Sequence, residues 1–485
     1  MNELLGRAEE AFSRHAEEEA LQHLLEAWRS SRAEHIAALV ERLSKRLTAG
    51  LSPLDCEPGS FIMLERRPLN LTRLLASVLE GADRGFPGAL RQSLRAFKSW
   101  PADPRFTPVL LAITRMPVAS DLGVPDVLYE LIDAVGDPRA VDPLLELRAG
   151  LVPGTDAVRR LDTVVQHLDP ARFPPLDAEA SRRCEELEDA LSTREASEAR
   201  SASTREALLA RVYADPEDIP ARMVLADHLM EHGDPLGEFI TLQCAPQVDA
   251  ARIEQLLEAN RSRWVDPFGP SVLGGKGSVH FARGLPAIVR MNTWGRELLI
   301  EPGPCWQTVR DIDWAHGVFR DVAEWLAHPH LRNVRGLWNM DAEMALGLGS
   351  RPLAVRSLSL LGPVSERAPK LFVRLSELPS LERLRVQNAS PDDVRLCAGS
   401  RLASRLVDFE AEWEGAWALR VKPRHDLPVL ATLETEEGAE PLSRAIRGAA
   451  GFGTRALRIQ VMRGTWRSRK QLEEAVFGYT KVEWE

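Results

Sequence analysis

The chain has 485 residues and a mass of 53.9 kDa, enough for two to four domains of roughly 100 to 200 residues each. Its 61 basic and 71 acidic residues give a net charge of −10, which argues against a protein that binds nucleic acid by neutralising phosphates. No apolar run reaches the roughly 18 residues of a membrane span and no secretory signal is visible, so we expect a cytoplasmic protein without membrane insertion.

The first third of the chain has the apolar spacing of amphipathic helices. Apolar residues at i, i+3, i+4 and i+7 recur at residues 21–28, 36–43, 71–78, 128–135 and 161–168. The first two sets are separated by a short polar segment and predict a helical hairpin. We therefore predict an α-solenoid or a helical bundle over residues 1–176.

Two segments of this region are close repeats. Asp103-Pro-Arg-Phe-Thr-Pro-Val-Leu-Leu is followed 34 residues later by Asp137-Pro-Arg-Ala-Val-Asp-Pro-Leu-Leu. Asp is a good helix N-cap and Pro suits the first helical position, so each segment is predicted to start a helix. The repeat resembles HEAT-type α-solenoid units, which implies a groove for a peptide or a partner protein. A bundle that only supports the rest of the chain is the alternative.

The middle of the chain is predicted to be helical and acidic. Residues 177–203 have few large apolar side chains and form a helical or flexible linker, followed by a helical domain at 204–265. The segment Tyr213-Ala-Asp-Pro-Glu-Asp, followed by the sequence from Leu225-Ala-Asp-His-Leu-Met-Glu-His to Gln243, resembles the bacterial repeat-companion domain, an uncharacterised family. Its members accompany leucine-rich or other repeats and often extend into a segment similar to Phe281-Ala-Arg-Gly-Leu-Pro. Residues 205–245 carry a charge of −5, which fits an acidic docking face or a solvated helix surface.

One motif in this segment could carry chemistry. His228-Leu-Met-Glu-His232 matches H-x-x-E-H, in which two histidines on one helical face hold zinc and Glu231 polarises a water molecule. However, a Gly-Asp-Pro sequence ends the helix directly after His232, and the nearest third ligands, Glu297 and Glu301, precede a Pro-Gly pair. We therefore predict no catalytic residue, no bound metal and no cofactor. A zinc-dependent hydrolase centred on this motif is the alternative.

Other chemical signatures are missing from the sequence. The five cysteines, which lie far apart without a CxxC motif, are expected to be small buried residues: Cys56, Cys184, Cys244, Cys305 and Cys397. The sequence has no Walker A loop, no G-x-S-x-G elbow and no G-x-G-x-x-G after a strand. The sequence therefore favours neither an enzyme nor a small-molecule substrate.

Residues 278–485 show a third pattern, close to L-x-x-L-x-L and repeated about every two dozen residues. Its fourth positions are Ile312, Val334, Leu358, Leu384, Phe409, Leu433, Leu457 and Val482. This resembles the leucine-rich repeat family, in which repeats of about 20 to 29 residues each add a strand to a concave parallel sheet. The resemblance implies short convex-side helices, as at 318–327 and 471–478, and a turn role for Asn339. A strand at 287–291, with Ile288 in register, is expected to start the sheet.

The repeat pattern also predicts an exposed surface, because the third and fifth positions of each strand point away from the core. The charged residues at these positions are Asp311, Asp313, Arg335, Arg383, Arg385, Asp408, Glu410 and Glu434. Two interpretations remain open: cross-strand ion pairs that neutralise one another, or a charged surface that selects a partner protein.

Together these patterns predict an α + α/β chain with a helical solenoid or bundle, a small helical connector domain and a leucine-rich-repeat solenoid. The expected function is non-enzymatic. We expect an interaction, scaffold or adaptor protein that binds one or more proteins, chiefly through the concave face of the C-terminal solenoid.

Overall fold

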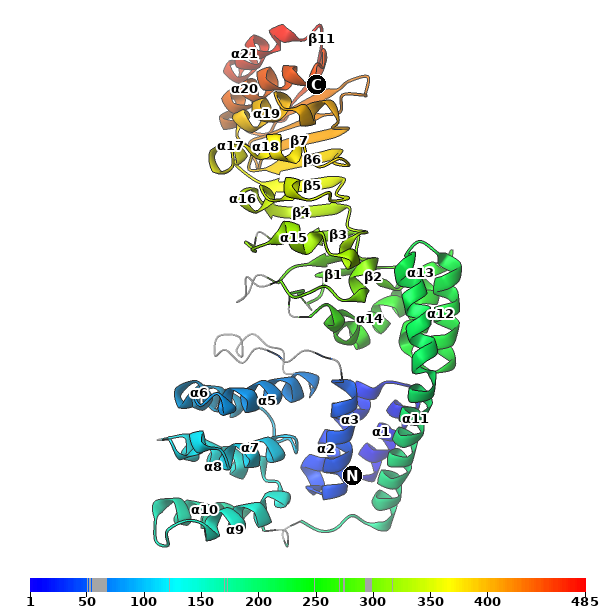
Figure 1. Cartoon of the computed structure of the whole chain (residues 1–485), viewed down its shortest axis with the longest axis vertical. Helices are drawn as coiled ribbons and strands as arrows, with labels where there is room; N and C mark the ends of the chain where they lie inside the picture. The colour runs from blue at the N-terminus through cyan, green and yellow to red at the C-terminus, as the bar shows by residue number, and fades with distance from the viewer. Residues whose placement is uncertain are drawn as a thin grey trace. The chain divides into compact units, whose positions relative to one another are not determined.

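The computed structural model describes residues 1–49, 51, 54, 68–121, 123–169, 171, 173–247, 249–269, 271–273, 275–292, 299–315 and 317–485. Up to about residue 268 the described chain is all helical, and after it an α/β region contains an eleven-stranded, mostly parallel sheet (Figure 1). This confirms the predicted helical N-terminal part and parallel-sheet C-terminal part. Among the helices of the described residues, none has the length and apolar character needed to cross a membrane.

The described chain divides into two compact units. The first contains residues 1–207, 224–239 and 248–267, and the second contains residues 208–223, 240–247 and 268–485.

The first unit is a series of packed helices around one apolar core. Its helices up to residue 167 are α1 (Asn2–Ser13), α2 (Glu17–Ser31), α3 (Glu34–Leu47), α5 (Pro68–Asp83), α6 (Pro87–Phe97), α7 (Phe106–Thr114), η1 (Pro117–Ser120), α8 (Val124–Val135), η2 (Pro138–Ala140), α9 (Val141–Ala149) and α10 (Asp156–His167). All five predicted segments lie in helices, and their apolar positions are buried or partly buried in this core. The helices α1 and α6 were not predicted.

The repeated Asp-Pro-Arg segments adopt the same contacts. In each, the aspartate accepts a hydrogen bond from the backbone N–H two residues later, Asp103 from Arg105 at 3.0 Å and Asp137 from Arg139 at 3.1 Å. Each aspartate also pairs with the guanidinium of that arginine. The α-helices themselves begin later than predicted, at Phe106 and Val141, because the prolines lie in a turn and in η2.

The predicted linker is helical. The 37-residue helix α11 (Ala178–Ala214) is followed by α12 (Ile219–Glu231), α13 (Pro235–Cys244), α14 (Ala250–Val265) and η4 (Asp266–Phe268). The end of α12 is a Schellman motif, in which Gly233 N–H donates to Met230 O and Asp234 N–H donates to Leu229 O. Gly233 has φ +69°, the left-handed conformation that this motif requires.

The eleven strands of the second unit lie in the sheet in sequence order. They are β1 (Val279–Ala282), β2 (Leu285–Arg290), β3 (Asp311–Asp313), β4 (Gly336–Asp341), β5 (Ser357–Leu361), β6 (Arg383–Gln387), β7 (Asp408–Trp413), β8 (Trp417–Val421), β9 (Val429–Leu433), β10 (Ala456–Val461) and β11 (Lys481–Trp484). The pair β1–β2 and the pairs that β8 forms with β7 and β9 are antiparallel, and all other pairs are parallel.

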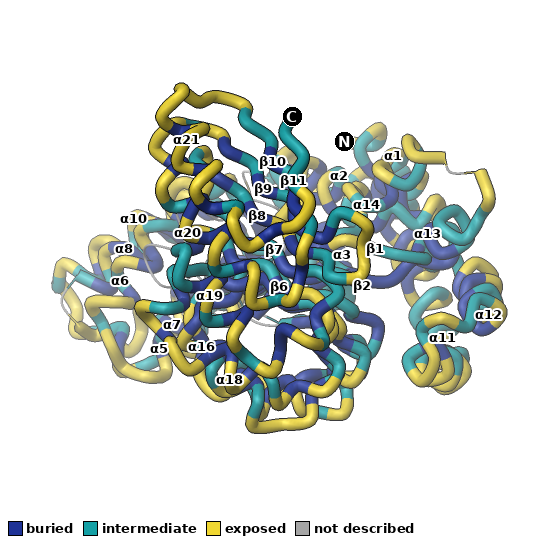
Figure 2. The backbone as a smooth tube through the Cα atoms, turned by 90° about the horizontal axis from the view of Figure 1, so that it is seen from above, coloured by how far each residue is buried: buried dark blue, intermediate teal, exposed yellow. Residues whose placement is uncertain are grey.

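Short helices lie along one side of the strands (Figure 1), and exposed stretches of α18 and α21 are yellow in Figure 2. They are α15 (Val322–Leu326), α16 (Ala342–Ala345), α17 (Val364–Arg367), α18 (Leu371–Leu375), α19 (Pro391–Ala398), α20 (Ala439–Ala449) and α21 (Trp466–Ala475). Shorter 3-10 turns are η5 (Pro304–Thr308), η6 (Pro329–Leu331), η7 (Leu348–Ser350), η8 (Arg401–Ser404), η9 (Glu436–Gly438), η10 (Ala450–Phe452) and η11 (Val476–Gly478). Helix α20 packs against both β8 and β9.

One apolar residue from every strand forms a continuous row across the sheet. In strand order the row is Val279, Val289, Ile312, Leu337, Leu358, Leu384, Phe409, Val421, Val429, Leu457 and Val482. All but the last are buried. The row contains six of the eight predicted fourth positions, so most of the strand register was predicted correctly.

The register was wrong at three places. Leu337, not Val334, pairs with Ile312. The prediction chose Val334 because both residues are buried and the apolar pattern fits either of them. Val289, not Ile288, continues the row into β2.

Near the C-terminus, Val429 replaces Leu433 in the row, since Leu433 lies at the far end of β9. The unpredicted antiparallel strand β8 precedes β9 and changes where that strand begins.

Candidate functional site

The strand side chains that point away from the apolar row form the candidate interaction surface, called the open face below. Its members include Asp311, Asp313, Trp338, Asn339, Ser357, Ser359, Arg383, Arg385, Gln387, Asp408, Glu410, Glu412, Arg420, Arg458 and Glu483. They flank the row members along each strand, and burial alternates accordingly: in β6, Leu384 and Val386 are buried and their neighbours are more exposed.

Six of the eight predicted site residues lie on the open face. Asp311 pairs across the sheet with Gly336, and Arg383 and Arg385 of β6 lie opposite Asp408 and Glu410 of β7. The sixth, Asp313, lies at the end of β3.

The other two predicted residues lie outside the strands. Arg335 precedes β4 because of the register difference there, and its guanidinium donates to the carbonyls of Arg332 at 3.2 Å and Ala354 at 3.4 Å. Glu434 follows the last residue of β9 and is exposed.

Polar side chains connect four neighbouring strands on the open face. Asn339 Nδ2 donates to Asp313 Oδ1 at 2.8 Å, and Gln387 Nε2 donates to Asn339 Oδ1 at 3.0 Å and to Ser359 Oγ at 3.1 Å. The expectation that Asn339 bonds turn backbone was wrong, because this residue lies inside β4. The hydrogen bonds stabilise the sheet itself and leave these amides occupied.

Most charges of the open face form ion pairs across strands. Arg385 Nη2 lies 2.6 Å from Glu412 Oε1, and Arg458 Nη2 lies 2.9 Å from Glu483 Oε2. Arg420, on the unpredicted strand β8, donates to both oxygens of Asp408 at 2.9 and 2.5 Å, and these hydrogen bonds raise the pKa of Arg420. For these residues the geometry favours the interpretation of neutralising cross-strand pairs.

Two side chains differ from this pattern. Arg383 is exposed and forms no ion pair within the part of the chain that the structure describes. Trp338 is 36% exposed on β4, and its indole contacts Asp311 through a side-chain hydrogen bond. Burial raises the pKa of Asp311, which that hydrogen bond partly offsets. The sequence pattern did not identify Trp338, because a register shift separates the buried Leu337 and Met340 by three residues and interrupts the alternation of this strand.

The Asp311 carboxylate lies close against the backbone of Gly336. A Cβ added there would lie 1.9 Å from Asp311 Oδ1, so a side chain at this position would displace the carboxylate that contacts Trp338. The position of the exposed indole is therefore set by both strands β3 and β4.

The H-x-x-E-H motif lies at the end of α12 in the first unit. Ligand atoms of His228, Glu231 and His232 all lie within 4.8 Å of one another, and the two imidazole centroids are 4.5 Å apart. His232 Nδ1 donates to the backbone carbonyl of His228 at 2.8 Å, which leaves Nε2 as the free ring nitrogen. Burial lowers the pKa of His228, and the positive charge of His232 and Arg205 adds to this effect.

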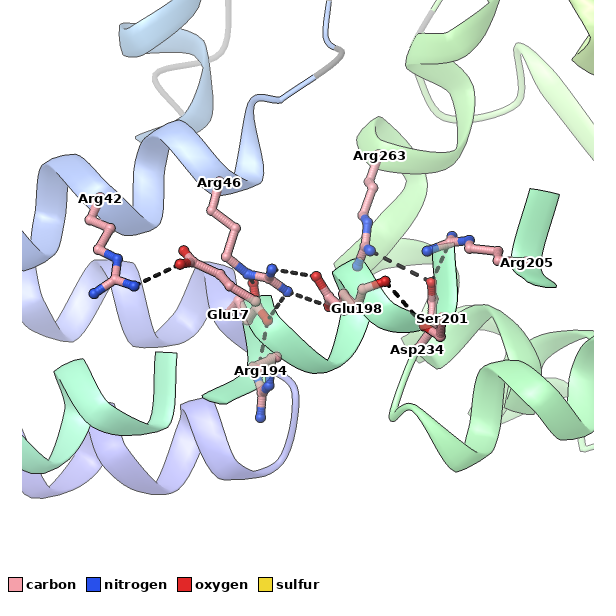
Figure 3. A network of polar contacts seen from close by, with 10 residues as sticks. Glu17, Arg42, Arg46, Arg194, Glu198, Ser201, Arg205, Asp234 and Arg263 are labelled. Atoms are coloured by element: carbon pink, nitrogen blue, oxygen red, sulfur yellow. Dashed lines mark hydrogen bonds and ion pairs between the residues drawn. The ribbon is translucent and has the colours of Figure 1, made fainter. Parts of the chain in front are cut away.

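A pocket of about 350 Å³ lies beside the two histidines, lined also by Leu229, Ser201, Ala202 and Asp234. The charges around it are paired (Figure 3): Arg205 lies 2.8 Å and Arg263 3.6 Å from Asp234 Oδ2.

At the other end of this network, Arg46 bonds both Glu198 and Glu17 (Figure 3). Glu17 is 8% exposed, and burial raises its pKa, but the hydrogen bonds and charges of Arg46 and Arg194 outweigh burial and lower it. The network therefore depends on ionised carboxylates at neutral pH.

Glu297 and Glu301 are the nearest candidates in the sequence for a third zinc ligand of this motif. Glu301 belongs to the second unit, where its side chain is 89% exposed and lies 3.7 Å from His328 Nε2. Glu297 lies outside the described residues. The three donors that the structure groups among the described residues are His228, Glu231 and His232.

None of the four described cysteines is in a disulfide. Cys184 and Cys397 are buried, and Cys244 and Cys305 are partly buried, while Cys56 lies outside the described residues. Burial raises the pKa of Cys184 to about 11 and that of Cys305 to about 12. Such thiols are poor nucleophiles at neutral pH.

No protein-family model, curated protein or solved structure matches this chain.

Proposed function

We propose that the chain is a non-enzymatic interaction or scaffold protein that binds one or more partner proteins through the open face of its C-terminal sheet. The observation that carries this proposal is the exposed Trp338 on β4 together with the unpaired Arg383 on β6. The strand between them, β5, contributes only Ser357 and Ser359, whose small side chains cannot cover either residue. Tryptophan and arginine are the residue types most often dominant in protein interfaces.

The surrounding contacts narrow the kind of partner. Because Arg385, Arg420 and Arg458 are neutralised within the sheet, a partner meets little net charge from them. Arg383 is available to a carboxylate of the partner, and the indole of Trp338 offers an apolar contact beside it. The expected partner surface is therefore acidic next to an apolar pocket or groove.

The proposal includes the family resemblances. Parallel strands that alternate with short helices, and the row from Ile312 to Val482, support a leucine-rich-repeat solenoid with an inserted strand β8. The matching contacts of Asp103–Arg105 and Asp137–Arg139 support a HEAT-like repeat in the first unit.

The contacts of Arg222 support the repeat-companion resemblance. This guanidinium is 2% exposed and donates to the carbonyls of Pro216 and Arg283. Arg222 thus links the start of α12 to the turn between β1 and β2. This turn is part of Phe281-Ala-Arg-Gly-Leu-Pro, the segment into which the repeat-companion domain often extends.

The test compares two double variants of the full chain. Trp338→Ala with Arg383→Glu alters the open face, and Trp466→Ala with Arg374→Glu makes the same changes on α21 and α18, where the side chains are 72% and 59% exposed. Each immobilised protein is used for affinity capture from the source cell, with quantitative mass spectrometry and chemical crosslinking. We expect proteins held by the wild type and the helix-side variant to be lost by the open-face variant, with crosslinks on β4 to β7. Equal retention of the same proteins by both variants would overturn the proposal.

A further inference from the structure

We propose that His228, Glu231 and His232 bind a divalent transition-metal ion of the Zn²⁺ type. Their three ligand atoms lie within 4.8 Å of one another, which no other group of histidine, cysteine and acidic side chains in the described residues matches. This site is independent of the interaction surface proposed above.

The spacing of the motif explains why the three donors meet. Residues at i, i+3 and i+4 are neighbours on a helix surface, so both imidazoles and the carboxylate lie over the same turn at the end of α12. In a tetrahedral zinc site with bonds of about 2.0 to 2.1 Å, ligand atoms are about 3.4 Å apart. Rotation of the exposed Glu231 side chain and small changes in the two rings can bring the donors to this separation.

The end of the helix holds His232 in place. The Schellman motif fixes the backbone on both sides of this residue, through Gly233 N–H to Met230 O and Asp234 N–H to Leu229 O. A Cβ on Gly233 would lie 1.9 Å from the ring of His15, so the turn is packed against a neighbouring side chain. The Gly-Asp-Pro sequence that ends α12 therefore orders the second histidine.

The hydrogen bond of His232 has the arrangement found in metal-binding histidines. Its Nδ1–H donates to the carbonyl of His228 at 2.8 Å, which fixes the tautomer and directs the lone pair of Nε2 away from the helix. The nearby Arg205 is paired with Asp234 at 2.8 Å, so part of its charge is neutralised and does not repel a cation as a free guanidinium would.

The donor set selects the class of ion. Two imidazoles and one carboxylate suit Zn²⁺ and its transition-metal neighbours, whereas Mg²⁺ and Ca²⁺ prefer oxygen ligands. Three protein ligands leave at least one coordination position for water or for a side chain of another molecule. The two histidines also line the pocket of about 350 Å³, which gives such a ligand room to enter.

The experiment measures metal binding by the full chain. The chain is treated with a chelator, dialysed and titrated with Zn²⁺ against a chromophoric chelator, with Mg²⁺ as the control ion. The test variant is His228→Ala with His232→Ala.

The matched control variant is His35→Ala with His167→Ala. It removes two histidines outside the motif, which lie 3.3 Å from Glu188 and 3.0 Å from Asp133. A third variant, Glu231→Gln, keeps both imidazoles and changes only an exposed carboxylate, so it tests the site with little risk to folding.

We expect the wild type and the control variant to bind one Zn²⁺ per chain that Mg²⁺ does not displace. The histidine variant should lose this ion, and Glu231→Gln should bind it more weakly. Full Zn²⁺ stoichiometry in the variant without His228 and His232, or no binding by the wild type, would overturn the proposal.

Discussion

Replacing Leu358 with alanine tests the apolar row at its centre. This residue is 1% exposed and lies between Leu337 and Leu384 of the neighbouring strands. The change removes three carbon atoms from the core, a loss of roughly 2.4 kcal/mol at about 0.8 kcal/mol for each buried carbon. Adding the cavity left behind, the expected decrease in the free energy of unfolding is roughly 2 to 5 kcal/mol.

A matched change at the end of the same row gives the control. Val482 occupies the corresponding position in the edge strand β11 but is only partly buried. Its replacement by alanine removes two carbons from a site that is open on one side, so we expect a loss of only about 1 kcal/mol.

Urea unfolding followed by tryptophan fluorescence measures both effects. Eight of the twelve tryptophans lie between Trp306 and Trp484, so the signal reports mainly on the second unit. The midpoint of this transition should fall for Leu358→Ala with an unchanged slope. A midpoint equal to that of the wild type, or a loss no larger than that of Val482→Ala, would refute the reasoning.

Three further changes test other features. Glu17→Gln should destabilise the first unit by about 3 kcal/mol at pH 7. Because the folded pKa of Glu17 is lowered, the stability that this carboxylate contributes is lost as the pH falls from about 4.5 through the folded pKa. The difference in stability between the variant and the wild type should therefore narrow at pH 3, and a constant difference would contradict this. In a chain with Cys56→Ser and Cys244→Ser, a thiol reagent at pH 8 should react slowly before denaturation, because a pKa of about 11 at Cys184 leaves a thiolate fraction on the order of one in a thousand. Rapid labelling of this folded chain would contradict the burial of Cys184. Gly233→Ala should lower the thermal midpoint of unfolding more than Gly154→Ala. Both glycines have positive φ, but a Cβ would meet another side chain only at Gly233. Equal shifts of the midpoint would argue against the contact with His15.

Much of the fold could be predicted because apolar periodicity determines burial. Leu358 and Leu384 lie where the pattern places them. In each strand the next buried residue on the same face is two positions later, Leu360 or Val386, so either choice predicts the same buried face. The pattern failed where two choices are equally apolar. Val334 and Leu337 are both buried, so hydrophobicity alone could not decide which of them pairs with Ile312.

The candidate sites were predictable in part. The positions of Arg383 and Asp408 followed from the register, but their different environments depend on Arg420, which lies on a strand that carries no repeat signal. The motif around His228 was evident, but its third donor was not, because the distance between a carboxylate and two imidazoles depends on side-chain geometry at the helix end.

Strand β8 has a consequence for the curvature of the sheet. Between β7 and β9 the chain passes through this strand instead of a helix, and α20 packs against both β8 and β9. The sheet layer thus gains about 4.8 Å of width at this point, whereas the helical layer lacks a helix, which would need about 10 Å. A stack of strands and helices bends when its helical layer is wider than its strand layer, so strand β8 should make this part of the sheet straighter.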